Sequence, residues 1–181
     1  MNALTLPLTN RLMVLAAPHA ASQMMLELAA RLSLNGELCV LDGGNRFNVY
    51  PVARAARRHT HDLHAALARI RLARAFTCYQ MLAMLSEAPA DGLPVLVIDL
   101  LATFYDDNVR LEESQRLLGQ CIPHLQRLSQ FAPVVVSVKP PAPLCAEKIV
   151  LAETLQAASG AAWQLESLPT PKTTTLWGEE V

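Results

Sequence analysis

Two kinds of hydrophobic pattern alternate along the chain. Short runs rich in Val, Ile and Leu are almost continuously apolar, which favours β-strands covered on both faces. The longer segments between them carry apolar residues every three or four positions, as amphipathic helices do. The pattern predicts strands at residues 11–17, 37–42, 94–100, 133–138 and 162–166, and helices at 21–34, 49–59, 62–87, 111–130 and 146–158.

This alternation predicts the α/β fold class. Parallel strands need long crossover connections, which the predicted helices supply, and buried parallel strands have helices on both faces of their sheet. With 181 residues, of which 52% are apolar, one domain can bury a sizeable core without disulfides or metals. We therefore expect a single domain over residues 1–181, with a mostly parallel central sheet.

Cysteine usage and the apolar runs indicate a compartment. The four cysteines, Cys39, Cys78, Cys121 and Cys145, are far apart and form no C-x-x-C pair, so neither a zinc ribbon nor a redox dithiol is indicated. We expect them to be small buried hydrophobes in a reducing cytoplasm. No apolar run approaches the roughly 18 residues of a membrane span, and the run at 12–17 is too short for a signal peptide. The expected location is cytoplasmic, without a membrane partner.

Three consecutive segments carry a resemblance to a known family. Residues 61–87 contain the phrase I-x-x-A-R-A-[FY] followed by a Q-M helix, matched by Ile70, Ala73, Arg74, Ala75, Phe76, Gln80 and Met81. Residues 95–107, VLVIDLLATFYDD, form an apolar strand that ends in Asp99, and residues 111–138 continue with a helix and a strand. Over residues 11–139 this order resembles the RecA/RadA recombinase family. The resemblance implies a RecA-like core, with helices on both faces of the sheet and Asp99 in the second phosphate-site motif.

The phosphate-binding turn of such an ATPase is missing. A nucleotide-binding turn of this kind reads G-x-x-x-x-G-K-[ST], whereas residues 16–25 read AAPHAASQMM, without glycine, lysine or threonine. Without glycine we expect the turn not to adopt positive φ readily, and without lysine the phosphates lose their main cation. Ser22 is interpreted as a helix N-cap.

A second catalytic element is also absent. The resemblance implies an acidic residue shortly after the Asp that ends the second strand, but here Asp42 is followed by Gly43 and Gly44. Ser22, Asp42 and Asp99 are therefore vestigial, and we predict no catalytic residue, no cofactor and no metal. For Asp99 the expected role is structural, because an Asp at a strand end can cap a neighbouring turn.

The histidine cluster His59, His61 and His64, with Asp62, offers an alternative chemistry. Imidazoles and carboxylates are common metal ligands, but the spacing does not match the H-x-H-x-D-H motif of metallo-β-lactamase-like hydrolases. We expect Asp62 to cap a helix and the histidines to be solvated.

Charge is unevenly distributed. Residues 46–74 hold seven arginines and one carboxylate, whereas residues 91–113 hold six carboxylates and one arginine. The candidates for contacts with nucleic acid or a protein partner are Arg54, Arg57, Arg58 and Lys139, with Trp177 as an aromatic anchor. Basic and acidic faces could also pack head to tail between subunits. A net charge of −1 and 5% aromatic residues argue against strong autonomous DNA binding.

These observations predict a non-catalytic RecA-like protein. It would be an accessory or structural subunit in DNA recombination or repair, acting through other protein subunits as a homo- or hetero-oligomer, with at most weak contact to DNA. Two alternatives stay open. The first is an ATPase with a non-standard phosphate site, and the second is an architectural ring subunit without DNA contact, similar to the RecA-like subunits of Elongator.

Overall fold

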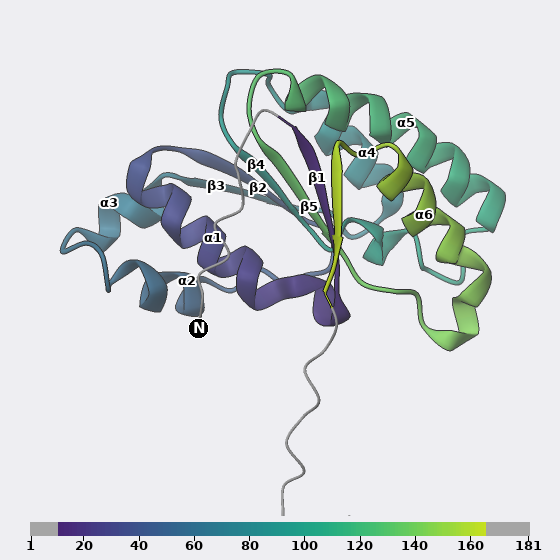
Figure 1. Ribbon diagram of the computed structural model, residues 1–181, viewed down its shortest axis with the longest axis horizontal. Coiled ribbons are helices and arrows are strands. Elements are labelled where there is room, and N and C mark those ends of the chain that lie inside the picture. The colour runs from purple at the N-terminus through teal and green to yellow at the C-terminus, as the bar shows by residue number, and fades with distance from the viewer. Residues whose placement is uncertain (1–10, 166–181) are drawn as a thin grey trace, which may run out of the picture.

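A six-stranded parallel β-sheet forms the centre of the molecule (Figure 1), as seen in a computed structural model that describes residues 11–165. The strands are β1 (Leu12–Ala16), β2 (Leu38–Asp42), β3 (Ile70–Arg74), β4 (Val95–Ile98), β5 (Val134–Val138) and β6 (Ala161–Gln164). They follow the order β3-β2-β4-β5-β1-β6, and every neighbouring pair is parallel. The predicted α/β class is confirmed, and the arrangement is consistent with a RecA-like α/β core.

Helices cover both faces of this sheet. One face carries α1 (Ser22–Asn35), α2 (Val49–Ala56) and α3 (Leu63–Ala68), and the other carries α4 (Cys78–Glu87), α5 (Leu111–Ser129) and α6 (Ile149–Ala157) (Figure 1). Three short 3-10 segments, η1 (Pro18–Ala21), η2 (Leu100–Thr103) and η3 (Pro143–Lys148), follow β1, β4 and β5. Among the described residues, no helix is both long and apolar enough to cross a bilayer.

Strand periodicity divides the core into two layers. Successive residues of a strand point to opposite faces, so Val14 and Val97 pack toward α4 and α5, whereas Met13 and Ile98 pack toward α1 and α2. All four of these side chains are at most 1% exposed. The nearly continuous apolar strands in the sequence are thus explained by burial on both faces.

The prediction of one long helix at residues 62–87 is wrong. Asp62 does cap a helix, because its Oδ1 accepts the N–H of Ala65 at 2.9 Å, but α3 ends at Ala68. The chain then forms β3, an edge strand that pairs with β2 alone, before α4 begins. Because most of β3 is exposed, its apolar residues do not form the continuous run that identified the central strands. The overlooked signal is Thr77, whose hydroxyl oxygen accepts the N–H of Gln80 at the start of α4.

Candidate functional site

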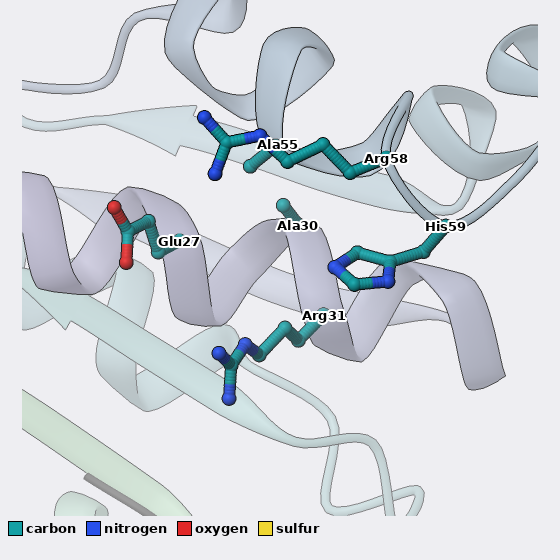
Figure 2. A pocket seen from close by; sticks show the side chains of 6 residues that line it. All are labelled: Glu27, Ala30, Arg31, Ala55, Arg58 and His59. Carbon is teal, nitrogen blue, oxygen red and sulfur yellow. The ribbon is translucent and has the colours of Figure 1, made fainter. Parts of the chain in front are cut away.

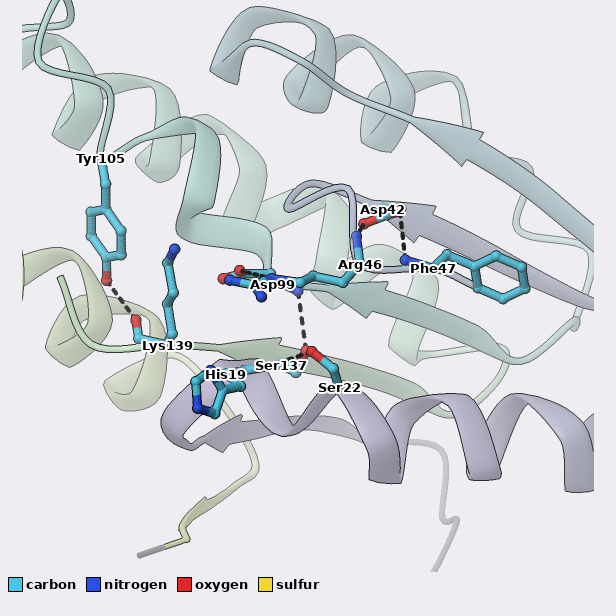
Figure 3. A network of polar contacts seen from close by, with 9 residues as sticks. All are labelled: His19, Ser22, Asp42, Arg46, Phe47, Asp99, Tyr105, Ser137 and Lys139. Atoms are coloured by element: carbon cyan, nitrogen blue, oxygen red, sulfur yellow. Dashed lines mark hydrogen bonds and ion pairs between the residues drawn. The ribbon is translucent and has the colours of Figure 1, made fainter. Parts of the chain in front are cut away.

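The carboxyl ends of the parallel strands bring together three of the residues predicted from sequence. In open α/β sheets, ligands bind beyond these ends. Asp42 ends β2, Asp99 follows β4 directly, and Lys139 follows β5 directly (Figure 3). Ser22, at the start of α1, lies on the same edge. This edge is therefore the candidate site.

Asp42 organises the turn that follows its own strand. Its side chain is fully buried; Oδ1 accepts the N–H of Arg46 and Oδ2 accepts the N–H of Phe47, both at 2.9 Å. The Nε of Arg74 lies 3.3 Å from Oδ2 as well. Both carboxylate oxygens are thus occupied by groups of the protein, and the role that these contacts support is structural.

Asp99 is held by an arginine of the neighbouring loop. Its Oδ2 lies 3.3 Å from Nε of Arg46, and its own N–H donates to the Ser137 hydroxyl at 3.1 Å (Figure 3). Burial raises the pKa of the Asp99 carboxyl, while the charges of Lys139 and Arg46 oppose that rise. Oδ1 is buried without a hydrogen-bond partner among the described residues. The carboxylate is therefore half satisfied, and by a cation of its own chain.

Gly43 and Gly44 lie directly against Asp99. A Cβ on residue 44 would fall 2.6 Å from both Cβ and Oδ2 of Asp99, and one on residue 43 would fall 2.8 Å from the Asp99 carbonyl oxygen and from Cε of Met81. A side chain here would require the end of β4 to move. Packing against Asp99 thus accounts for glycine at the place where the resemblance implies an acidic residue.

The turn between β1 and α1 departs from two of our expectations. His19, Ala20 and Ala21 have φ values of 55°, 53° and 48°, so the absence of glycine does not prevent positive φ. Each left-handed non-glycine residue costs about 1–2 kcal/mol. Burial of Ala20 and the hydrogen bond that the Ser22 hydroxyl donates to the His19 carbonyl offset part of this cost. Ser22 is the first residue of α1 and not its N-cap, which is Ala21 and has no side-chain cap.

Hydrogen bonds join the two loops that follow β4 and β5. Lys148 is 3% exposed, and its Nζ donates to the carbonyls of Phe104, Asp106 and Val109 at 3.0, 2.7 and 2.8 Å. The Tyr105 hydroxyl also donates to the carbonyl of Lys139 at 3.2 Å. Sequence analysis missed Lys148, because a lysine before an apolar helix gives no sign of burial.

A hollow of about 500 Å³ opens over the carboxyl ends of β2 to β5. Its lining includes Gly44, Phe76, Asp107, Lys139 and Cys145. The Cys145 thiol lies 2.9 Å from Oδ1 of Asp107, and this hydrogen bond raises the pKa of the thiol, so Cys145 is not an activated nucleophile. The hollow has the size and mixed polarity to accept a small polar ligand.

The predicted basic candidates do not form one surface. Lys139 lines the hollow at the strand ends, whereas Arg54 and Arg58 line a separate hollow between α1 and α2. Across residues 11–165, the side chains of Arg54, Arg57 and Arg58 have neither an ion pair nor a hydrogen bond. The other four arginines of the basic stretch bind carboxylates or carbonyls: Arg46, Arg69, Arg71 and Arg74. Trp177 lies outside the described residues.

The three histidines of the predicted cluster, His59, His61 and His64, lie on different segments around α2 and α3. His59 follows α2 and lines a small hollow (Figure 2), His61 precedes α3, and His64 is exposed on α3. Among residues 11–165, no three His, Cys, Asp or Glu side chains are grouped so that they could hold a metal ion.

Comparison with known proteins finds no relative that indicates a function, so the functional argument rests on the fold and the geometry of the site. No model of a protein family matches the chain, and no curated protein matches its sequence. Fold and site together define an α/β protein with a parallel sheet whose carboxylates at the strand ends are bound by arginines of the same chain.

Proposed function

We propose that this protein is a non-catalytic RecA-like protein, a degenerate ATPase that serves as an accessory or structural subunit in DNA recombination or repair. The kinship with recombinases is itself part of the proposal. It is supported by the matched phrases in the sequence and by a parallel sheet in which Asp99 follows a fully buried strand. The free state of all four cysteines supports a cytoplasmic location.

The ion pair between Arg46 and Asp99 carries the proposal. In a catalytic site of this class, a carboxylate at this place would face a metal and a nucleotide. Here one of its oxygens binds an arginine of the same chain, and the other is buried. The turn before α1 has neither a lysine nor a glycine with which to hold phosphates. The chain therefore neutralises its own carboxylate without a ligand.

Assembly is supported by the open edge of the sheet. Within residues 11–165, β3 forms one edge of the sheet, and an exposed edge can pair with another chain. Three large apolar side chains on β3 and at the start of α4 are exposed, namely Leu72 at 41%, Phe76 at 69% and Tyr79 at 53%. Exposed apolar residues beside an unpaired edge are typical of protein interfaces.

A nucleotide-binding ATPase with a non-standard phosphate site is a second candidate. It is favoured by the hollow at the strand ends, which Lys139 lines, and by Oδ1 of Asp99, which has no hydrogen-bond partner within residues 11–165. An architectural ring subunit without DNA contact is a variant of the first proposal. It differs in leaving Arg54, Arg57 and Arg58 free of nucleic acid.

The mass of the purified protein, measured by light scattering, tests the proposal. We expect an oligomer whose mass does not change with ATP-magnesium or single-stranded DNA. Phe76→Glu should reduce that mass, whereas the matched change Phe131→Glu, on a ring that is 54% exposed and lies away from β3, should not. A monomer that assembles only with ATP, with a thermal shift lost in Asp99→Ala, would establish the ATPase instead.

A further inference from the structure

A cationic groove runs between α1 and α2, on the face of the sheet opposite α4 to α6. One hollow, of about 300 Å³, has Arg54 and Arg58 on its walls and Leu26 and Pro51 among its apolar lining. It adjoins a smaller hollow of about 40 Å³, because Glu27, Ala55 and Arg58 line both (Figure 2). We call the two hollows together the α1–α2 groove.

Positive charge in this groove is not neutralised by the fold. The smaller hollow adds Arg31 to Arg54 and Arg58, and the His59 ring lines it as well (Figure 2). Within residues 11–165 none of these arginines has an ion pair, even though Glu27 lines the same groove. The Glu27 carboxylate instead accepts a hydrogen bond from Gln23 at 3.2 Å. Guanidinium groups without partners are the natural binding sites for carboxylates.

The floor of the groove is apolar. Leu26 and Ala30 are buried on α1, and Pro51 and Ala55 on α2 are half-buried. An apolar floor between cationic walls matches a peptide that presents an apolar side chain flanked by carboxylates. The volume of the larger hollow, about 300 Å³, is at the lower end of the range for ligand pockets, which suits a few side chains.

We infer that the α1–α2 groove binds an acidic peptide segment of a protein partner, whose carboxylates pair with Arg54 and Arg58 while an apolar side chain enters between Leu26 and Ala55. This inference rests on the proposed function, since it names the chemistry of a partner. Nucleic acid fits less well. Among the described residues, no Phe, Tyr or Trp side chain lines the groove for base stacking.

Arg57 supplies a matched control for this inference. It is exposed on the same segment and has no ion pair within residues 11–165, but it lines neither hollow. The affinity for a peptide bound in the groove should depend on Arg54 and Arg58 and should not depend on Arg57. Binding driven by the general positive potential of α2, as for nucleic acid, depends on all three arginines alike.

Selection from a random peptide library on the full chain, followed by fluorescence anisotropy of the enriched peptides, tests the inference. We expect acidic peptides with an apolar residue, whose affinity falls by about tenfold or more in Arg54→Glu/Arg58→Glu. It should fall by less than about twofold in Arg57→Glu/Arg110→Glu, in which the exposed Arg110 at the N-cap of α5 makes the change of charge equal. Glu27→Gln should tighten binding, because it removes the one carboxylate of the groove. Arg54→Gln/Arg58→Gln repeats the test without charge reversal, and circular dichroism verifies that each variant folds.

Three results would overturn the inference: no enrichment of acidic peptides, equal loss of affinity in the Arg57 control, or displacement of the peptide by an oligo-dT strand that binds in its place. The mass of each variant separates this inference from the proposed function. If Arg54→Glu/Arg58→Glu loses peptide binding but keeps its oligomeric mass, the groove and the assembly surface are independent. An oligomer that binds no acidic peptide would refute the groove alone.

Discussion

Nε of Arg46 lies 3.3 Å from Oδ2 of Asp99, although the two residues are 53 positions apart in the chain. The contact joins the loop after β2 to the end of β4. It places a half-exposed cation over a carboxylate that has no exposed surface. The stability of this edge of the sheet should therefore depend on the pair.

Removing the cation should destabilise the fold. Arg46→Met leaves a buried carboxylate without its ion-pair partner, at an expected cost of about 1–3 kcal/mol in the free energy of unfolding. Urea denaturation measures this loss of stability. Arg54→Met is the control, because Arg54 has no ion pair in the described residues, and it should change stability by less than about 0.5 kcal/mol. Equal losses in the two variants would contradict a stabilising role for the pair.

The pH dependence of stability should reveal the buried Asp99 carboxyl. Burial raises its pKa in the folded state, so the native protein holds this proton to higher pH than the unfolded chain does. The contribution of Asp99 is then most favourable below its unfolded pKa and is lost as pH rises through the folded pKa. Relative to the wild type, Asp99→Asn should gain stability as the pH rises from about 4 through the range in which the folded carboxyl loses its proton. Urea denaturation across that range checks the sign, and a constant difference would refute it.

Gly44 should not tolerate a methyl group. Its Cβ would lie 2.6 Å from Asp99, so Gly44→Ala should destabilise the protein by about 1–3 kcal/mol. Gly119 is the matched control, because it lies within α5 and a Cβ there meets nothing within 4 Å. Gly119→Ala should stabilise by about 0.5–1 kcal/mol. Thermal unfolding of both variants distinguishes close packing at residue 44 from a general effect of glycine.

The left-handed turn before α1 predicts a stabilising substitution. Ala21 has a φ of 48°, which glycine adopts at no steric cost, so Ala21→Gly should raise stability by about 0.5–1 kcal/mol. Ala83→Gly, at an exposed position inside α4, should lower it by a similar amount, about 0.5–1 kcal/mol. If both variants lose stability, residue 21 is not held in the left-handed region in solution.

Lys148 should be essential for the order of the loop after β4. Lys148→Met removes three donors from buried or half-buried carbonyls, and we expect a loss of about 2–5 kcal/mol. Hydrogen exchange should rise in residues 104–110 before it rises in the sheet. Lys139→Met, at the other lysine of this region, removes no side-chain hydrogen bond within residues 11–165 and should leave exchange in that loop unchanged.

Sequence patterns predicted the central strands because burial on both faces leaves a continuous apolar run. They failed at β3, which we predicted to be part of a helix. This edge strand is mostly exposed, so its sequence lacks the continuous apolar run of a buried strand. Asp42 and Asp99 were predicted at strand ends, but Lys139 was grouped with the arginines of α2 and lies at the carboxyl end of β5 instead. The arginine on Asp99 was not predicted, because a contact over 53 positions depends on how the turn at Gly43 and Gly44 folds back. The burial of Lys148 is equally a product of tertiary packing.

The bonds of Lys148 and Tyr105 also have a mechanical meaning. They join the loop after β4 to the loop after β5. Here the ammonium group of Lys148 and the phenol of Tyr105 hydrogen-bond one loop to the other, so we expect the two loops to move together. A force or a ligand acting on residues 104–109 is transmitted directly to the start of α6. A partner that binds either loop should therefore shift the position of both.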